Sequence, residues 1–253
     1  MHEKHEAGHM LLARLGKKRL RPGGKQGTDW LIRQVSIGAN TRILEVACNM
    51  GTTAIELAKR YKCHITGIDL HDASLQKATH NARIQGVSDC VRFMRANATA
   101  LPFDDASFDI VINEAMLTML DNESKRKALQ EYARVLRPGG YLLTHDLIIR
   151  SADTQNSLSQ LHSAINVKAT PLSEHEWKAL LSAQGFKVRT LTGPMSLLSP
   201  MGMIRDEGFL NTLKIVKNAM KQENRPMFMR MFRLFRQSKG IFGFIAACSQ
   251  KVQ

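Results

Sequence analysis

The stretch RILEVACNMG, residues 42–51, decides the fold. Its first five residues form a short, largely apolar run with β-branched members, which predicts a strand buried in a parallel sheet. Gly51 and the two threonines after it begin a helix that we expect to continue to about Tyr61. A tight turn from a strand into a helix lets backbone N–H groups and the helix N-terminus meet the negative group of a ligand. The stretch therefore predicts the first βα unit of an α/β domain, with a ligand site at its turn.

Strands and helices continue to alternate on the C-terminal side of this unit. Further strands are predicted at residues 64–69, 91–94, 109–113, 141–145, 186–191 and 242–248. Further helices are predicted at residues 73–86, 123–136 and 173–185. Alternation on this scale predicts a doubly wound, Rossmann-like α/β fold, with a mostly parallel seven-stranded sheet and helices on both faces.

We expect one domain with additions, because 253 residues suit an α/β domain that carries insertions. The predicted parts are an N-terminal helical segment at 1–40, a Rossmann-like core at 41–192, a helical insertion at 193–239, and the last core strand with the C-terminus at 240–253. Strand six is expected to run parallel to its neighbours, so the insertion would start at the ligand edge of the sheet. The sequence therefore predicts that the insertion forms a helical cap over the site.

Two carboxylates at strand ends indicate the class of ligand. Asp69 closes the second strand, eighteen residues after Gly51, where a carboxylate can accept both ribose hydroxyls of an adenosine. The turn lacks the GxGxxG spacing that lets a pyrophosphate approach the backbone, and the chain has no GxxxxGK[ST] phosphate loop. Glu45 at the first strand end suits a ligand with an ammonium and a sulfonium better than one with a diphosphate. These features argue against a nicotinamide-dependent dehydrogenase.

Three motifs, in the right order, resemble those of a known family. Residues 45–51, EVACNMG, resemble the first methyltransferase motif, E/D-x-G-x-G-x-G. Residues 100–111, ALPFDDASFDIV, look like the segment before strand four in the type 11 class I S-adenosylmethionine-dependent methyltransferases, and residues 132–140, YARVLRPGG, match the signature that leads into strand five. That group includes the ubiquinone and menaquinone C-methyltransferases. The resemblance covers about residues 25–150.

The resemblance implies S-adenosylmethionine as the cofactor and assigns the residues around it. The methionine end would contact Glu45, Ala47, Gly51 and Asn113, the ribose Asp69, and the adenine Leu70, Asn97 and Ala98. Arg21 or Lys25, near the turn before the first helix of the core, could meet the cofactor's carboxylate, although a plain turn is an equal alternative. Ala47 and Asn49 replace two motif glycines. Asn tolerates left-handed backbone, whereas Ala47 would need a negative φ. A non-catalytic protein that binds S-adenosylmethionine therefore stays an alternative.

The resemblance implies an enzyme that transfers a methyl group in line from a sulfonium to a nucleophile. Such a reaction needs the nucleophile about 3 Å from the methyl carbon, and a base only if the acceptor must lose a proton. Glu114, after strand four, and His145, at the end of strand five, are the candidate catalytic residues. The alternatives are that the Glu114 carboxylate only supports other site residues or lies at a helix N-terminus, and that His145 has a structural role.

The charge distribution bears on the acceptor. The net charge is +14, and the excess lies in residues 1–40, with eight Lys/Arg against three Asp/Glu, and in residues 201–253, with ten against three. This distribution suits an anionic partner or a merely solubilising surface. An RNA methyltransferase stays an alternative, although aromatic residues are only 6% and do not interleave with the basic patches.

The insertion favours a small or lipid-like acceptor. Seven of the thirteen methionines lie between residues 195 and 231, and flexible thioethers suit pockets that adapt to apolar ligands. Two apolar stripes with cations beside them occur at helical spacing: Phe209, Leu213, Val216 and Met220, then Phe228, Met231, Phe232 and Phe235. Contact with an anionic membrane surface is one interpretation; packing of both stripes on the domain is the preferred one.

Other features predict a cytoplasmic protein without a metal. No apolar run is long enough to span a bilayer, the N-terminus lacks a secretory layout, and the four cysteines show no CxxC spacing. His2, His5 and His9 share helical spacing, but a solvated face is expected so near a chain end.

Overall fold

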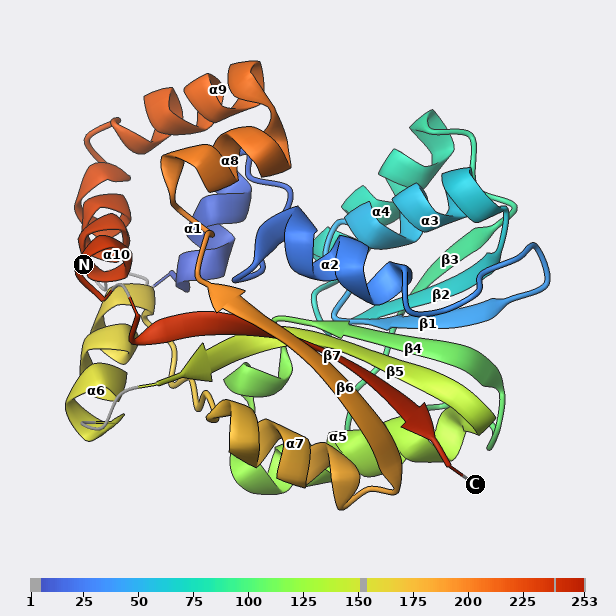
Figure 1. The fold of residues 1–253 in the computed structure, drawn as a ribbon. Helices are drawn as coiled ribbons and strands as arrows, with labels where there is room; N and C mark the ends of the chain where they lie inside the picture. The colour runs from blue at the N-terminus through green and yellow to red at the C-terminus, as the bar shows by residue number, and fades with distance from the viewer. Residues whose placement is uncertain (1–5, 151–153, 239, 253) are drawn as a thin grey trace.

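The computed structural model describes residues 6–150, 154–238 and 240–252, and its centre is one seven-stranded sheet (Figure 1). The strand order is β3-β2-β1-β4-β5-β7-β6. The strands are β1 Arg42–Val46, β2 His64–Asp69, β3 Val91–Arg95, β4 Phe108–Glu114, β5 Leu136–Ile149, β6 Phe186–Pro194 and β7 Phe242–Lys251. The first five strands pair in parallel, so the predicted α/β fold and the mostly parallel sheet are confirmed.

β7 reverses the direction of the sheet. It pairs antiparallel with β5 on one side and with β6 on the other. β6 therefore has the direction of β1–β5, as expected, but its partner in the sheet is antiparallel, so the prediction that it runs parallel to its neighbours was wrong. The insertion after β6 still leaves from the carboxyl edge of the parallel strands, because β6 ends at that edge.

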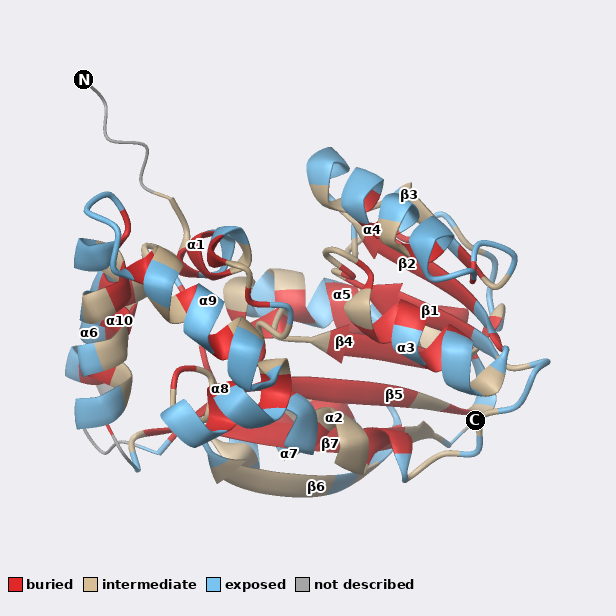
Figure 2. Ribbon diagram, turned by 90° about the horizontal axis from the view of Figure 1, so that it is seen from above, coloured by how far each residue is buried: buried red, intermediate tan, exposed pale blue. Residues whose placement is uncertain are grey.

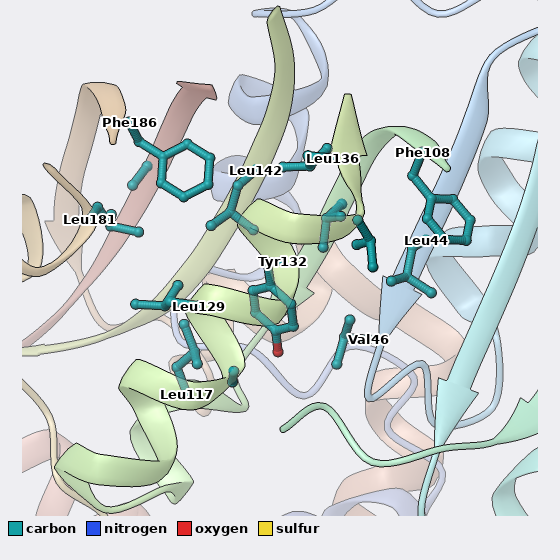
Figure 3. Packing of buried hydrophobic residues seen from close by; sticks show 14 of the residues in the cluster. Leu44, Val46, Phe108, Leu117, Leu129, Tyr132, Leu136, Leu142, Leu181 and Phe186 are labelled. Carbon is teal, nitrogen blue, oxygen red and sulfur yellow. The ribbon is translucent and has the colours of Figure 1, made fainter. Parts of the chain in front are cut away.

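Helices cover both faces of the sheet (Figure 1). α2 Gly24–Ile32, α3 Thr52–Tyr61 and α4 Asp72–Ile84 lie on one face, and α5 Asn122–Val135 and α7 Glu174–Ser182 on the other. A separate apolar core fills each interface. In the core on the α5 side, the fully buried Tyr132 lies among aliphatic side chains from the sheet and the helices (Figure 3).

A third layer of helices covers the carboxyl edge of the parallel strands. It consists of α1 Gly8–Leu15, α6 Thr154–Ile165, α8 Pro200–Glu207, α9 Phe209–Ala219 and α10 Arg225–Gln237. These helices share a third core, which includes Leu11, Ile215 and Met231. Among the described residues no helix is both long and apolar enough to cross a membrane.

Two buried carboxylates of α8 fasten the N-terminal segment to the insertion. Glu207 pairs with the Lys17 ammonium at 3.5 Å, with both side chains fully buried, and accepts the backbone N–H groups of residues 18 and 19. Asp206 accepts the backbone N–H of Lys25 at 3.0 Å, near the start of α2. A carboxylate there satisfies a donor that the helix leaves unpaired and favours the helix dipole. The two segments, far apart in sequence, therefore form one unit.

The two apolar stripes of the insertion have different environments. The α10 stripe packs as preferred: Phe228 and Met231 are buried and Phe232 is half-buried. The α9 stripe does not, since its outer side chains Phe209, Leu213 and Met220 are 61%, 52% and 42% exposed. α9 instead turns its Thr212, Ile215 and Ala219 inward. Small and β-branched residues there allow close packing in the third core, so the larger residues face outward.

Candidate functional site

A pocket of about 690 Å³ lies at the carboxyl ends of β1, β2 and β4, between these strand ends and α1. Seven of the residues predicted from the sequence line it: Glu45, Ala47, Asp69, Leu70, Asn97, Ala98 and Glu114. Ligands of open α/β sheets bind at this edge, since backbone groups and helix N-termini converge there. The pocket has the size of an ordinary small-molecule site.

The turn after β1 adopts left-handed backbone at three alternate positions. Ala47, Asn49 and Gly51 have φ of 54°, 48° and 73°. These are the positions at which the methyltransferase motif has glycine. The condition that Ala47 have a negative φ is not met; the turn holds an alanine in a conformation that costs about 1–2 kcal/mol. Two features favour glycine at position 51: its φ is left-handed, and a Cβ there would come within 2.6 Å of the Phe93 ring.

Asp69 connects this turn to the loop after β2. Its Oδ2 accepts the backbone N–H of Asn49 and its Oδ1 that of His71, each at 2.9 Å. Each carboxylate oxygen has more than one lone pair, so both can accept a further hydrogen bond from the pocket side. Two acceptors, held side by side, fit a pair of vicinal hydroxyls such as those of a ribose.

Glu45 is a buried carboxylate at the wall of the pocket. Its side chain is 6% exposed, and its Oε2 accepts the backbone N–H of Ala54 in the first turn of α3 at 2.9 Å. Burial raises the pKa of Glu45 to about 7, while the Arg21 guanidinium and the hydrogen bond from the Ala54 N–H act in the opposite direction. A carboxylate with so little solvation favours a cation next to it, which an ammonium group of a ligand would supply.

Glu45→Gln should stabilise the unliganded protein at about pH 8 by roughly 1–3 kcal/mol. The folded Glu45 titrates near 7, above its ordinary value of 4.5, so the folded state binds the proton more tightly and stability falls as pH rises through this window. Below about pH 4 the carboxyl is protonated in both states, and the gain should vanish. Chemical denaturation at both pH values measures the difference. Glu56→Gln, at a carboxylate of α3 that is 53% exposed, is the control. An equal gain at both pH values would contradict the titration of Glu45.

Glu114 lies in a buried cluster with Arg21. The Arg21 guanidinium forms an ion pair with Glu114 and also donates to the hydroxyls of Thr28 and Thr53, each at 3.0 Å. The two threonines in turn donate to the Glu114 oxygens, Thr53 at 3.1 Å. Arg21 and Glu114 are only 7% and 9% exposed. The cluster connects the N-terminal segment to the end of β4 and to α3.

His145 belongs to the same cluster and is fully buried. Its Nε2 accepts the backbone N–H of Gly23 at 3.1 Å, so the proton of the neutral ring lies on Nδ1, 3.4 Å from Glu114 Oε1. Burial, followed by the nearby Arg21, holds the pKa of His145 well below its ordinary value. A Cβ at Gly27 would come within 2.5 Å of this ring, so α2 packs directly on it. These contacts bury His145 away from the pocket and favour the structural role that the sequence left open beside the catalytic one.

Four predicted site residues do not line the pocket: Lys25, Gly51, Asn113 and His145. Lys25 contributes only its backbone to the Asp206 contact and is exposed. Asn113 is fully buried, and its amide donates to the Tyr132 hydroxyl at 3.0 Å. Among the described residues, the lining includes no residue of the 193–239 insertion, which packs behind α1 instead.

The N-terminal segment contributes more of the wall than the sequence predicted. Its lining residues are Glu6, His9, Met10, Ala13, Arg14, Lys18, Leu20 and Arg21. His9, considered above only for a metal, lies here, while His2 and His5 are outside the described residues. The described part of the chain holds no group of residues suited to a metal ion. The sequence predicts that the N-terminal segment is helical, but no local signal says what its helices cover.

Comparisons with known proteins agree with this geometry. A family model described as a methyltransferase domain matches residues 43–140. The chain is 55% identical to an uncharacterized protein of Haemophilus influenzae, over 98% of this chain and 99% of that protein. It is 36% identical to the O-methyltransferase rstn1 of Aspergillus nomiae, over 60% of this chain and 66% of the relative, so it spans just under two thirds of that enzyme.

A solved structure supports the fold alone. The cyclase SpnF superposes with a TM-score of 0.76 at 19% identity, over 95% of this chain and 92% of that chain. The family match falls on the segment that forms β1, the left-handed turn, Asp69 and β4. On these matches residues 43–140 form a domain of the methyltransferase family, and the sheet and the pocket are those expected of its class I S-adenosylmethionine-dependent members.

Proposed function

We propose that this protein transfers the methyl group of S-adenosylmethionine to a small, lipid-like acceptor. The observation that carries the proposal is a single pocket with two carboxylates on its β1–β2 side and an apolar, methionine-rich wall beyond β4. When bound, the cofactor supplies an electrophilic methyl group on a sulfonium. The protein's task is then to hold both partners in line in a dry site.

The carboxylate side suits the cofactor. Asp69 would hold the two ribose hydroxyls, and Glu45 would face the ammonium of the methionine part. Leu70 and Ala98 would pack on the adenine. Helix α1 would exclude water from this side, because its His9 and Ala13 line the pocket opposite the strand ends. Positioning of this kind can account for most of the acceleration of a displacement that needs no covalent intermediate.

The opposite wall suits an apolar acceptor. β4 lies on the far side of β1 from β2, so the residues that follow β4 line the part of the pocket away from Asp69. Those residues, together with their neighbours on the N-terminal segment, are Met10, Leu20, Met116, Met119 and Leu120. Unbranched thioethers adapt to ligands of irregular shape. The Lys18 ammonium of the N-terminal segment would favour an acceptor that also carries a negative group, whereas Arg14 is already paired with Glu6 at 2.7 Å.

Glu114 and His145 act in this proposal as positioning residues. The oxygens of Glu114 already receive Arg21, Thr28 and Thr53, which leaves little capacity to take a proton from an acceptor. His145 is closed off from the pocket and accepts a backbone N–H instead. Their common effect is to hold Arg21 and the N-terminal segment against the pocket, in place of the general-base role predicted from the sequence.

Incubation with S-adenosylmethionine tritiated in its methyl group, followed by fractionation, tests the function. Lipid extract, aqueous metabolites and RNA are offered as acceptors in parallel. We expect label in the organic fraction. Label confined to RNA would favour the alternative in which the basic flanks bind phosphates, a mode recognised by a steep loss of affinity with salt. Tight cofactor binding in calorimetry with no transfer to any fraction would favour the non-catalytic alternative.

A further inference from the structure

The outer face of α8 and α9 concentrates exposed apolar side chains. Of the ten large hydrophobic side chains that are exposed in the described residues, six lie within residues 201–220. These six define the α8–α9 face: Met201, Ile204, Phe209, Leu210, Leu213 and Met220. Met201 and Leu210 are 78% and 81% exposed, well beyond the exposure of partly covered core residues. Scattered apolar residues are ordinary on protein surfaces, whereas a cluster of this kind marks an interaction site.

The α8–α9 hairpin, residues 200–221, exposes its positive charges and buries its negative ones. Its four cations, Arg205, Lys214, Lys217 and Lys221, are all exposed. Its two acids are not, because the Asp206 and Glu207 side chains are fully buried against the N-terminal segment. Glu207 is paired with Lys17. Asp206 pairs with Arg205 at 3.2 Å, and the exposed Glu223 lies two residues beyond Lys221, so the three lysines are the positive charge that the hairpin presents beside its apolar groups.

The helix geometry places the two kinds of side chain next to each other. At 100° per residue, Phe209, Leu213 and Met220 form one stripe along α9, and the three lysines form the adjacent stripe. The buried residues of α9 lie on the remaining side. Figure 2 shows the exposed parts of α8 and α9 turned to the same side of the molecule. A helix that lies in a lipid headgroup layer has this arrangement, with apolar residues in the acyl boundary and cations at the phosphates.

We propose that the α8–α9 face docks on an anionic lipid surface. Charge complementarity favours this occupant over a second copy of the chain, because a twofold contact would bring this face of one copy against the same face of the other, with its lysines. Phe209 is the single aromatic residue of the α8–α9 face, so stacking platforms for nucleic acid bases are lacking there. α9 packs on α1, and α1 lines the pocket. If the proposed function holds, docking places the pocket wall close to the source of a lipid-like acceptor.

Co-sedimentation of the whole protein with vesicles tests the proposal. Vesicles of phosphatidylcholine alone are compared with vesicles that contain equal parts of phosphatidylcholine and phosphatidylglycerol. We expect binding to the anionic vesicles, weakened by salt, and little binding to the neutral ones. The double variant Leu210→Ser, Leu213→Ser should lose roughly a hundredfold in partitioning, since each inserted leucine contributes roughly tenfold. Both side chains are exposed, so the fold does not depend on them.

Further variants test whether vesicle binding depends on the α8–α9 face itself. Ile84→Ser changes an apolar side chain that is 69% exposed on α4, and it should bind as the parent does. The triple change of Lys214, Lys217 and Lys221 to Gln should lose roughly a hundredfold, since each cation near an anionic surface contributes roughly fivefold. A triple change of Arg83, Lys168 and Lys187 to Gln removes the same charge elsewhere and should have a much smaller effect.

Three outcomes would overturn the proposal. The first is that the parent protein does not bind anionic vesicles at low salt. The second is that the leucine double variant and the Ile84 variant bind equally. The third is a dimer in gel filtration that the leucine double variant abolishes. Calorimetry with S-adenosylmethionine in each variant keeps this test separate from the proposed function. Loss of vesicle binding with intact cofactor affinity concerns the face alone, whereas a parent protein that binds vesicles but no cofactor would refute the function and leave the face standing.

Discussion

Asp69→Ala should lower the affinity for S-adenosylmethionine by about 10²–10⁴-fold, measured by isothermal titration calorimetry. The variant removes two charge-assisted hydrogen bonds to the ribose, each worth about 1.5–3 kcal/mol. It also releases the backbone N–H groups of Asn49 and His71, which Asp69 holds at 2.9 Å. Both effects act in the same direction, because the left-handed turn at Asn49 forms part of the pocket wall.

Asp72, a neighbouring acid, is the control that distinguishes loss of the ribose contact from loss of a negative charge near the pocket. Asp72 begins α4 only three residues later, but its side chain is 63% exposed and pairs with Arg95 on the surface. Asp72→Ala should change cofactor affinity by less than about fivefold, as expected for an exposed ion pair. If Asp69→Ala and Asp72→Ala bind the cofactor equally well, Asp69 does not contact the ribose.

Glu114→Gln should lower the free energy of unfolding by about 3–5 kcal/mol. It should also lower the affinity for S-adenosylmethionine. Arg21 is 7% exposed and forms its direct ion pair with Glu114, so the variant leaves a buried guanidinium with only the more distant attraction of carboxylates such as Glu45. The N-terminal segment that carries Arg21 also lines the pocket, and its loosening should weaken binding. Thermal denaturation and calorimetry on the same preparation measure the two effects.

The pH dependence of turnover distinguishes positioning from general-base catalysis. A base contributes about 10²–10⁴-fold, and its removal changes the shape of the pH–rate profile. If Glu114 only positions Arg21, the saturated rate of Glu114→Gln should keep the shape of the parent profile, at a temperature where the variant is folded. Loss of the ionisation that limits the parent rate at low pH, with cofactor affinity intact, would instead make Glu114 the base.

Two further variants test the cluster itself. The double change Arg21→Met, Glu114→Gln should be more stable than Glu114→Gln alone, because the guanidinium that lost its ion-pair partner is removed as well. Glu123→Gln, which breaks an ion pair that is 58% and 72% exposed on α5, should cost less than about 1 kcal/mol. A double variant as unstable as the sum of its two single changes would show that Arg21 and Glu114 do not act together.

Local patterns were sufficient for the core fold and the cofactor side of the site. β1 and β2 occupy the residues predicted for them, because short apolar runs bounded by turns have few other ways to be buried. α7 begins where the helix was predicted to begin, with a capping box in which Ser173 and Glu176 satisfy each other's backbone N–H groups. Glu45 and Asp69 reach the pocket because each ends a parallel strand, and the carboxyl ends of neighbouring parallel strands share one edge.

Contacts between residues far apart in the sequence decided the rest of the fold and of the site. Nothing in residues 242–248 says that this strand inserts between β5 and β6 in the reverse direction, since a strand's periodicity is the same in both directions. Arg21 and Glu114 are 93 positions apart in the sequence, and only the docking of the N-terminal segment buries them together.

The two stripes of the insertion show the same division between local and tertiary information. Hydrophobic spacing correctly indicated that α9 and α10 are amphipathic helices, because a period of 3.6 residues is a local property. It could not say which face of α9 is covered. The third core has room for Thr212, Ile215 and Ala219 against α1, so Phe209 and Leu213 remain outside. The sequence by itself determined the helices and strands and the carboxylates at their ends; the tertiary packing decided which side chains are buried together and which face remains open.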